Sequence, residues 1–353
     1  MAELEKYKIN SSVSGKAAIK KLDEGGIGII VVVNDIGTVV GVITDGDFRR
    51  SVLKGIDMDA GVLQIANKEF KYLNKGYSKT EATDLFKKET GIERLLVLDN
   101  GKLSDIITEK DIDASSGKSV RLDNPVVIMA GGKGIRMEPF TRILPKPLIP
   151  IGDKTIIEII MDKYMEYWID NFFISVNYKA KMIKSYFEDE KTGYKITYID
   201  ESKPLGTAGS LKQLENRINK PLFVSNCDVI INDKYNKILE FHNDGNFDLT
   251  LVASLKSHTI PYGVCEIDKQ GSLTRLVEKP ESSFLVSTGM YILTPGILES
   301  IPSNTVYHMT DIIDSLQKKG RKVGVYPISE NSWIDIGRWE LYQNAINIFT
   351  LNR

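Results

Sequence analysis

From Asn124 onward, short apolar runs of strand length alternate with segments that carry the apolar spacing of helices. The strand-like runs are PVVIM, NFFISVN, YKITYID and PLFVSNCD, and the helical patterns between them are TIIEIIMDKYMEYW, KAKMIKSYFED and LKQLENRI. This alternation predicts a mainly parallel sheet covered by helices. In such a sheet, ligands bind outside the carboxyl ends of the strands. We therefore expect functional residues directly after the strands.

The first strand leads into a segment rich in glycine, proline and basic residues, MAGGKGIRMEPFTRILPKP. Glycines let a backbone turn sharply and approach a ligand, and prolines stiffen the chain. A flexible, solvated loop is the alternative, but a buried strand before it and prolines on both sides of Lys146 disfavour that reading. We interpret the segment as an anion site in which the amides of Ala130, Gly131, Gly132 and Gly134 wrap phosphates, and Lys133, Arg136, Arg142 and Lys146 supply positive charge.

Two other phosphate-binding motifs fail on their spacing. A dinucleotide fingerprint starting at Gly132 would need a glycine where Met137 stands. The sequence Gly117-Lys118-Ser119 lacks the P-loop glycine, whose place is taken by Ile112, and no strand leads directly into it. Neither a dehydrogenase nor a P-loop enzyme is indicated.

An internal repeat precedes position 120. The stretch IIVVVNDIGTVVGVITDGDFRR is echoed by RLLVLDNGKLSDIITEKDID, and each copy is a strand, a turn, a second strand and a helix start. Each copy ends on a threonine with an aspartate three residues later, Thr44 with Asp47 and Thr108 with Asp111, which predicts helix capping in both. The small and polar residues from Ala114 to Pro125 read as a linker.

Length and composition limit the class of protein. A chain of 353 residues suggests about two domains on a scale of ~150 residues each. The net charge of -1 argues against broad nucleic-acid binding. Cys227 and Cys265 form neither a disulfide framework nor a metal motif. With no export signal and no long apolar run, we expect a cytoplasmic protein without membrane or nucleic-acid partners.

The second part of the chain resembles the sugar-1-phosphate nucleotidyltransferases. The motifs that carry the resemblance recur in order over nearly all of residues 124–353, beginning with Gly131 to Arg136 and Pro145 to Pro147. The others are PLGTAGS, NCD, YGVCEID, VEKP, STGMY and WIDIG. The repeat over residues 1–120 resembles a tandem CBS-domain pair, a regulatory or dimerisation module in which an aspartate often contacts a nucleotide ribose. The resemblance implies an α/β protein whose CBS module precedes a Rossmann-like, glycosyltransferase-A-like domain.

The resemblance also implies roles for individual residues. Arg136 and Lys146 would be the catalytic cations, and Asp228 with Asp335 would hold Mg2+, which prefers oxygen ligands. The remaining contacts fall into three sets: Leu205, Gly206, Thr207, Ala208 and Gly209 beside the nucleoside, Glu278, Lys279, Ser287 and Gly289 at the sugar phosphate, and Asp47 and Asp111 as ligand contacts of the CBS pair. Taken alone, these residues read as helix caps, strand-end turns and a solvated Glu-Lys-Pro turn.

The order of the domains is similar to a bacterial group that includes the glucosamine-1-phosphate guanylyltransferase of legionaminic acid biosynthesis. That similarity favours GTP as donor and glucosamine 1-phosphate as acceptor in a homo-oligomeric enzyme. Mannose or heptose 1-phosphate stays open as acceptor, because Ser287 stands where an asparagine often serves the sugar. UTP, dTTP or CTP stays open as donor. A catalytically dead nucleotide sensor is the alternative from another class, against which the joint presence of Arg136, Lys146, Asp228 and Asp335 speaks.

Overall fold

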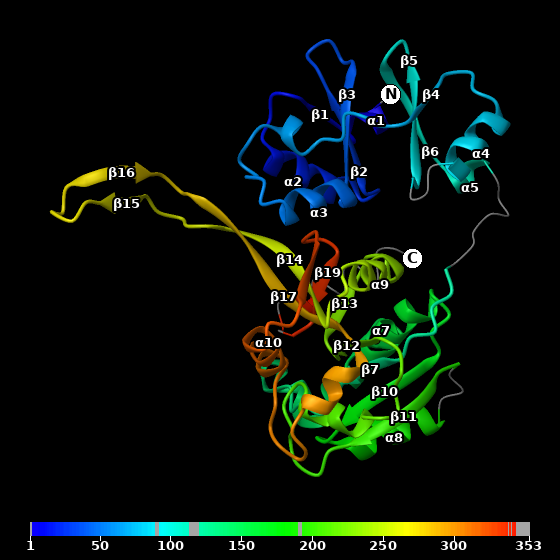
Figure 1. Ribbon diagram of the computed structural model, residues 1–353, viewed down its shortest axis with the longest axis vertical. Coiled ribbons are helices and arrows are strands. Elements are labelled where there is room, and N and C mark those ends of the chain that lie inside the picture. Colours follow the sequence, from blue (N-terminus) through cyan, green and yellow to red (C-terminus); the bar gives the residue numbers. More distant parts are fainter. Residues whose placement is uncertain are drawn as a thin grey trace. The chain divides into compact units, whose positions relative to one another are not determined.

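A computed structural model describes residues 2–88, 92–112, 120–189, 193–337, 339 and 341–343. The chain forms two compact units, Met1–Ser119 and Val120–Arg353 (Figure 1). The first half of the expected linker, including Gly117-Lys118-Ser119, lies outside the described residues. Within the described ranges, no helix is long and apolar enough to cross a membrane.

The first unit confirms the internal repeat. Its two halves each contain a three-stranded sheet, in the orders β1-β2-β3 and β4-β5-β6. In each sheet the first pair is parallel and the second is an antiparallel hairpin with one register shift. The elements are α1 (Ala2–Glu5), β1 (Lys8–Asn10), α2 (Gly15–Gly25), β2 (Ile29–Val33), β3 (Val39–Thr44), α3 (Asp45–Leu53), η1 (Val62–Gln64), β4 (Tyr72–Asn74), α4 (Lys79–Lys88), β5 (Arg94–Asp99), β6 (Lys102–Thr108) and α5 (Glu109–Ile112).

The second unit confirms the mainly parallel sheet. Its seven-stranded sheet has the order β11-β10-β7-β12-β17-β14-β18, and within this sheet only the described pairings of β17 with β12 and β14 are antiparallel. The strands of this unit are β7 (Val126–Met129), β8 (Pro150–Ile151), β9 (Lys154–Thr155), β10 (Asn171–Val176), β11 (Lys195–Asp200), β12 (Leu222–Asn226), β13 (Val229–Ile231), β14 (Leu249–Thr259), β15 (Val264–Ile267), β16 (Leu273–Val277), β17 (Glu281–Leu293), β18 (Val323–Ile328) and β19 (Trp333–Asp335).

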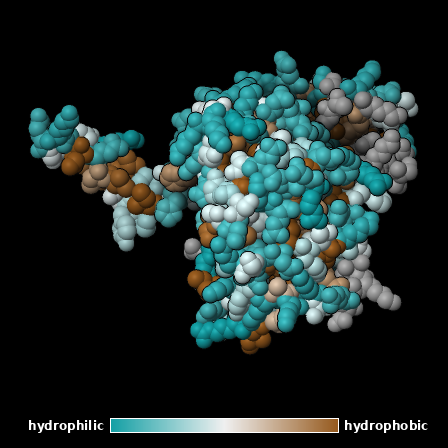
Figure 2. All heavy atoms as spheres, turned by 60° about the horizontal axis from the view of Figure 1, so that its bottom comes forward, coloured by the Kyte–Doolittle hydropathy of each residue, from teal (hydrophilic) through white to brown (hydrophobic). Residues whose placement is uncertain are grey.

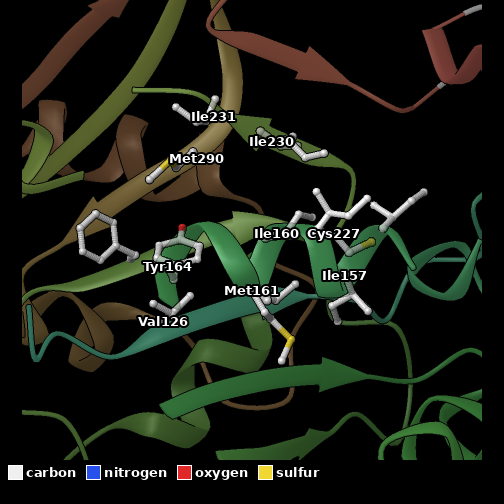
Figure 3. Close-up of a cluster of buried hydrophobic side chains, with 14 of the residues drawn as sticks. Val126, Ile157, Ile160, Met161, Tyr164, Cys227, Ile230, Ile231 and Met290 are labelled. Carbon is white, nitrogen blue, oxygen red and sulfur yellow. The ribbon is translucent and has the colours of Figure 1, made fainter. Parts of the chain in front are cut away.

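Helices cover both faces of this sheet, which explains why β7 is apolar at every position. Val126 belongs to one core cluster and Val127 to another, because successive strand residues point to opposite faces. Figure 3 shows the first cluster, where Ile157, Ile160 and Met161 of α7 lie beside β7. The helices are α6 (Phe140–Ile143), α7 (Ile156–Met165), α8 (Ala180–Asp189), α9 (Tyr235–Asp244) and α10 (Met309–Lys318), with shorter 3-10 turns η2 (Ile135–Met137), η3 (Lys146–Leu148), η4 (Gly209–Leu214) and η5 (Pro295–Ser300).

Two of the three expected helices of this unit are α-helices, namely α7 and α8. The third, over LKQLENRI, forms the 3-10 turn η4 and ends at Leu214. The pattern predicted the apolar face correctly, since Leu211 and Leu214 are buried against Ile297 and Leu298. It overestimated the length, because Asn216 adopts a left-handed backbone conformation that ends helical geometry.

His242 on α9 gives the fold a specific response to acid. Its Nδ1 lies 2.9 Å from Thr250 Oγ1 and its Nε2 lies 3.2 Å from Thr294 Oγ1. Burial lowers the pKa of His242 from 6.5 to about 4, against the opposing charge of Asp248. The unfolded chain therefore binds an additional proton between these values, so the contribution of this group to stability is complete above pH 6.5 and is lost as pH falls towards 4.

We expect His242→Gln to flatten the pH dependence of stability in that window. In the parent protein, titration of His242 changes the free energy of unfolding by up to about 3 kcal/mol across this window, and the variant should lack that change. Denaturant titrations at several pH values measure it, with the exposed His258→Gln variant as control. Equal slopes in His242→Gln and the parent protein would show that another group is responsible.

Candidate functional site

Residues selected from three separate parts of the sequence lie at the carboxyl edge of the central sheet. The glycine loop follows β7, Asp228 follows β12, and the 205–209 loop comes shortly after β11. These three strands are parallel, so their carboxyl ends lie at the same edge. The expected position of the site after the strands therefore agrees with the topology.

The glycine loop has a fixed shape. Gly134 adopts φ +66°, and its carbonyl accepts hydrogen bonds from the Met137 amide at 2.9 Å and from Thr141 Oγ1 at 3.0 Å. Lys179 holds the next turn through its Nζ, which donates to the carbonyls of Arg142 at 2.6 Å and Ile143 at 2.7 Å. The loop is therefore preorganised rather than loosely solvated.

The cations of this loop fall into two groups. Lys133 and Arg136 are exposed and make no hydrogen bond or ion pair within the described part of the chain. Arg142 is also exposed, but it pairs with Glu138 at 2.8 Å. Lys133 and Arg136 can thus receive an anion without breaking an existing pair.

We expect Gly134→Ala to lower the melting temperature, whereas Gly132→Ala changes it little. A β-carbon at Gly134 would lie 2.9 Å from Thr141 Cγ2 and 3.1 Å from Lys146 Cβ, and the positive φ strains any L-residue. The expected cost is about 1–2 kcal/mol, or several degrees. A β-carbon at Gly132 would meet nothing within 4 Å. Thermal melts of both variants test the difference, and equal melting temperatures would contradict the rigid conformation.

Lys146 and Asp228 form a buried ion pair between Nζ and Oδ2. Both residues are more than nine-tenths buried. Pro145 and Pro147 flank the lysine in η3 and fix the backbone that carries it. Next to this pair, burial and the charge of Asp228 raise the pKa of Cys227 to about 12, so its thiol is neutral at ordinary pH.

The strand pair β13·β19 brings Asp335 to Asp228. Val229 is paired with Asp335, and the amide of Ile336 donates to the carbonyl of Asp228 at 2.9 Å. A β-carbon at Gly337 would lie 2.7 Å from Asp335 Oδ1 and 3.3 Å from Asp228 Oδ2, so both carboxylates face one small space that a side chain at 337 would fill.

This donor set fits Mg2+. No group of three or more histidine, cysteine or acidic residues that could enclose a metal occurs within the described ranges. Mg2+ does not need such a cage, since it is commonly held by one or two carboxylates together with substrate phosphates. Asp228 and Asp335 are therefore the residues that would hold it.

The 205–209 loop packs against the segment that precedes α10. The carbonyl of Tyr307 accepts from the amides of Ala208 at 3.0 Å and Gly209 at 3.1 Å, and the amide of Met309 donates to Thr207 Oγ1 at 3.0 Å. A β-carbon at Gly206, whose φ is +79°, would lie 2.6 Å from the same Tyr307 carbonyl. The small residues of this loop thus have a packing role that sequence reasoning did not give them.

Glu201 is a central residue that the sequence analysis did not select. It is buried, and it accepts hydrogen bonds from the Ser175 hydroxyl and, at 2.8 Å, from the amide of Leu205. A β-carbon at Gly131 would lie 3.0 Å from its Oε1. Glu201 therefore joins β10, the glycine loop and the 205–209 loop. Its position directly after β11 was the signal that could have identified it.

The four residues expected at the sugar phosphate do not lie together. Gly289, with φ +90°, lies beside Asn226, whose Nδ2 would be 2.5 Å from a β-carbon there. Ser287 lies two residues before it on β17, and its Oγ is 3.3 Å from Tyr291 Oη. Glu278 and Lys279 instead lie in an exposed turn between β16 and β17. The structure thus brings Gly289 to the Asp228 segment and leaves Glu278 and Lys279 away from it.

In the first unit, both selected aspartates cap helices. The Oδ2 of Asp47 accepts from the Thr44 amide at 2.9 Å, and its Oδ1 pairs with Arg50 at 2.6 Å. The Oδ2 of Asp111 accepts from the Thr108 amide at 2.6 Å, which lowers the pKa of Asp111. Capping is confirmed in both copies, and a ligand role for either aspartate stays a prediction.

Comparison with known families agrees with this division of the chain. Residues 7–54 and 62–115 each match the CBS domain family. Residues 125–350 match the family described as Nucleotidyl transferase, which is well over half of the chain. This protein belongs to the nucleotidyl transferase family. The family assignment covers the glycine loop, both carboxylates and the strands that position them.

Several curated relatives of this nucleotidyl transferase act on sugar 1-phosphates. It is 33% identical over 224 residues to the mannose-1-phosphate guanyltransferase of Yarrowia lipolytica, covering 60% of each chain. It is 30% identical over 245 residues to the UTP–glucose-1-phosphate uridylyltransferase of Synechocystis, covering 62% of each. The matches thus span about three fifths of these relatives.

A solved structure extends the comparison to the fold. The crystal structure of HddC from Yersinia pseudotuberculosis superposes with a TM-score of 0.51 at 28% identity, covering 64% of this chain and all of that one. A second HddC structure, complexed with GMP-PN, gives the same TM-score at 27% identity.

Proposed function

We propose that the protein is a sugar-1-phosphate nucleotidyltransferase. The observation that carries this proposal is the convergence of the Lys146–Asp228 ion pair and Asp335 at the sheet edge where the rigid glycine loop presents Arg136. The shared family and the activities of the curated relatives support it.

In the proposed reaction a phosphate oxygen of the sugar 1-phosphate attacks the α-phosphorus of a nucleoside triphosphate. A new P–O bond forms as the bond to the β-phosphate oxygen breaks, and pyrophosphate leaves. Such a transfer asks the protein mainly for alignment and for positive charge. Lys146 is proposed to contact the α-phosphate as a fixed point charge, and Arg136 to bind the leaving pyrophosphate with its planar fork.

Mg2+ is the proposed metal, with Asp228 and Asp335 as its protein ligands. When bound, the ion would neutralise charge on the phosphate oxygens. Asp228 would then have two functions, because it also holds the ammonium of Lys146 in place. This shared carboxylate explains why a lysine is tolerated in a largely buried position at this edge.

Guanine is the proposed base and glucosamine 1-phosphate the proposed acceptor. The guanine preference is supported by the guanyltransferase among the relatives and by the HddC structure with GMP-PN. The acceptor follows from the domain order, which is similar to that of the glucosamine-1-phosphate guanylyltransferase of legionaminic acid biosynthesis. The uridylyltransferase relative keeps UTP as the leading alternative donor.

The test is a matrix of five nucleoside triphosphates against glucosamine, mannose, glucose and heptose 1-phosphates, read by pyrophosphate release. We expect turnover that requires Mg2+ and is fastest with GTP and glucosamine 1-phosphate. A faster reaction with another pair would correct the substrates and keep the reaction class. Absence of pyrophosphate release with every pair would refute the proposed activity.

We further propose that the CBS pair binds a nucleotide or pathway product and changes the transferase reaction. Regulation needs a ligand that distinguishes two states of the enzyme, with a coupling free energy of about 1–3 kcal/mol. Calorimetry of the intact protein with AMP, ADP, ATP and GTP should reveal binding that Asp47→Asn weakens and Asp228→Asn does not. If every nucleotide-binding event that is detected is weakened by Asp228→Asn, the CBS pair has no nucleotide site and serves dimerisation alone.

A further inference from the structure

A long β-ribbon extends from the second unit without covering any part of it. We call residues 257–285 the arm; they comprise the outer ends of β14 and β17 and the hairpin β15–β16 (Figure 1). No residue of the arm is buried. Figure 2 shows apolar residues along its projecting surface. Its large exposed apolar side chains are Tyr262, Ile267, Leu273, Leu276, Phe284 and Leu285.

A ribbon of this composition requires a partner. An isolated two-stranded ribbon is marginally stable in water, and a gathering of exposed apolar side chains marks an interaction surface. Stable protein–protein interfaces use about 20–30 residues on each side, which matches the length of the arm. The arm alone could therefore provide one side of a specific interface.

The direction of the arm is fixed at its base. Lys256 pairs with Glu330 at 2.9 Å, and its ammonium lies 5.1 Å from the ring centre of Trp333. From Ala253 opposite Ser287 to Thr259 opposite Glu281, the β14–β17 ladder continues without a shift. Because β14 is parallel to the strands that carry the site, the arm leaves the sheet at the same carboxyl edge as Asp228.

This geometry separates two parts of the proposed sugar site within one chain. Gly289 lies at the Asp228 segment, next to an irregularity in the β14–β17 ladder, and Glu281 lies eight residues earlier on β17. The unshifted ladder between Ser287 and Glu281 alone spans about 20 Å at ~3.4 Å per residue. Glu278 and Lys279 lie beyond it. They are held by the arm itself, since the Lys279 amide donates to the Tyr262 carbonyl at 3.2 Å. Neither side chain can reach the sugar position of its own chain in this conformation.

We infer that two copies of this chain exchange arms, so that each arm covers the partner's site and supplies Glu278 and Lys279 to the partner's sugar phosphate. This assignment rests on the proposed function. In a two-fold symmetric dimer each arm covers the site of the other chain, because the arm and the site lie at the same edge of the sheet. The exchange buries the apolar side chains of both arms and completes both sites. A second copy is the partner because it offers a site that lacks the same two residues.

Complementation tests the exchange through activity. Lys279→Ala and Asp228→Asn chains with different tags are co-expressed, and the mixed dimer is purified. In one of its two sites the intact Asp228 of the first chain meets the intact Lys279 of the second. We therefore expect about half of the parent activity in the mixed dimer and almost none in either pure variant. Lys269→Ala at the hairpin turn is the control and retains activity. A mixed dimer without activity, formed from inactive parents, would overturn the exchange.

Cross-linking tests the exchange independently of any activity. Full-length chains labelled with 14N and 15N are mixed by co-refolding, and a lysine cross-linker is added at low protein concentration. We expect mixed-isotope links that join the arm to the rest of the second unit, between Lys269 or Lys279 and Lys133 or Lys179. Links confined to single-isotope pairs would show that the arm folds back on its own chain and would refute the proposal. Mixed links without pyrophosphate release from any substrate pair would retain the exchange and reject the proposed function.

Discussion

Asp228→Asn is expected to lower the turnover number by at least ~10²-fold under saturating substrates and Mg2+. The substitution keeps the shape of the side chain but removes the charge that pairs with Lys146 and that faces the same space as Asp335. It should also reduce stability, because the ammonium of Lys146 is left buried without a counter-charge, a change that costs about 3–5 kcal/mol in other proteins.

The two effects of Asp228→Asn are separated by measuring turnover well below the melting temperature of the variant. Asp123→Asn is the matched control, since Asp123 pairs with Lys220 in an exposed ion pair and such pairs contribute about 0–1 kcal/mol. Its turnover and melting temperature should stay near those of the parent protein. A folded Asp228→Asn enzyme with the parent turnover would remove this carboxylate from the mechanism.

Lys146→Met is expected to reduce turnover as strongly as Asp228→Asn. Methionine fills most of the buried space but offers no charge to the α-phosphate, and loss of one preorganised cationic contact costs about 3 kcal/mol in the transition state. The single variant also leaves the largely buried carboxylate of Asp228 as an unpaired charge. Single-turnover kinetics should therefore show a slower chemical step.

The double variant Lys146→Met/Asp228→Asn distinguishes a functional pair from two independent residues. Removing both charges leaves no buried unpaired ion, so we expect the double variant to be more stable than the sum of the single changes implies. Its turnover should nevertheless stay as low as that of either single variant. Additive losses of stability would contradict the ion pair, and recovery of turnover would contradict the role of Lys146.

The sequence predicted the strands and the edge of the sheet well, for a physical reason. Strands buried on both faces read as continuous apolar runs, and the last four residues of PVVIM form β7, in which every residue is buried. Because the strands were expected to be parallel, the positions after them could be assigned to one edge. That inference placed Asp228 and the glycine loop together.

Other features depend on contacts between distant residues and have no local pattern. The antiparallel direction of β17 follows from its long ribbon with β14, which the apolar spacing does not encode. The pairing of Lys146 with Asp228 joins separate elements, and both residues alone read as ordinary polar positions. The separation of Lys279 from Gly289 likewise depends on how the β14–β17 ribbon extends, whereas the family resemblance had assigned both residues to the sugar phosphate.

The pairing of β13 with β19 has a consequence for protein synthesis. Asp228 leaves the ribosome well before Asp335, and at about 5–20 residues per second the interval between them lasts roughly 5–20 s. During that interval the nascent chain already contains the glycine loop, Lys146 and Asp228, but not the second carboxylate. Prematurely released chains would thus carry the proposed nucleotide site with only one of its two proposed metal ligands. We expect such fragments to be inert, so that only chains that have passed Asp335 consume nucleotide.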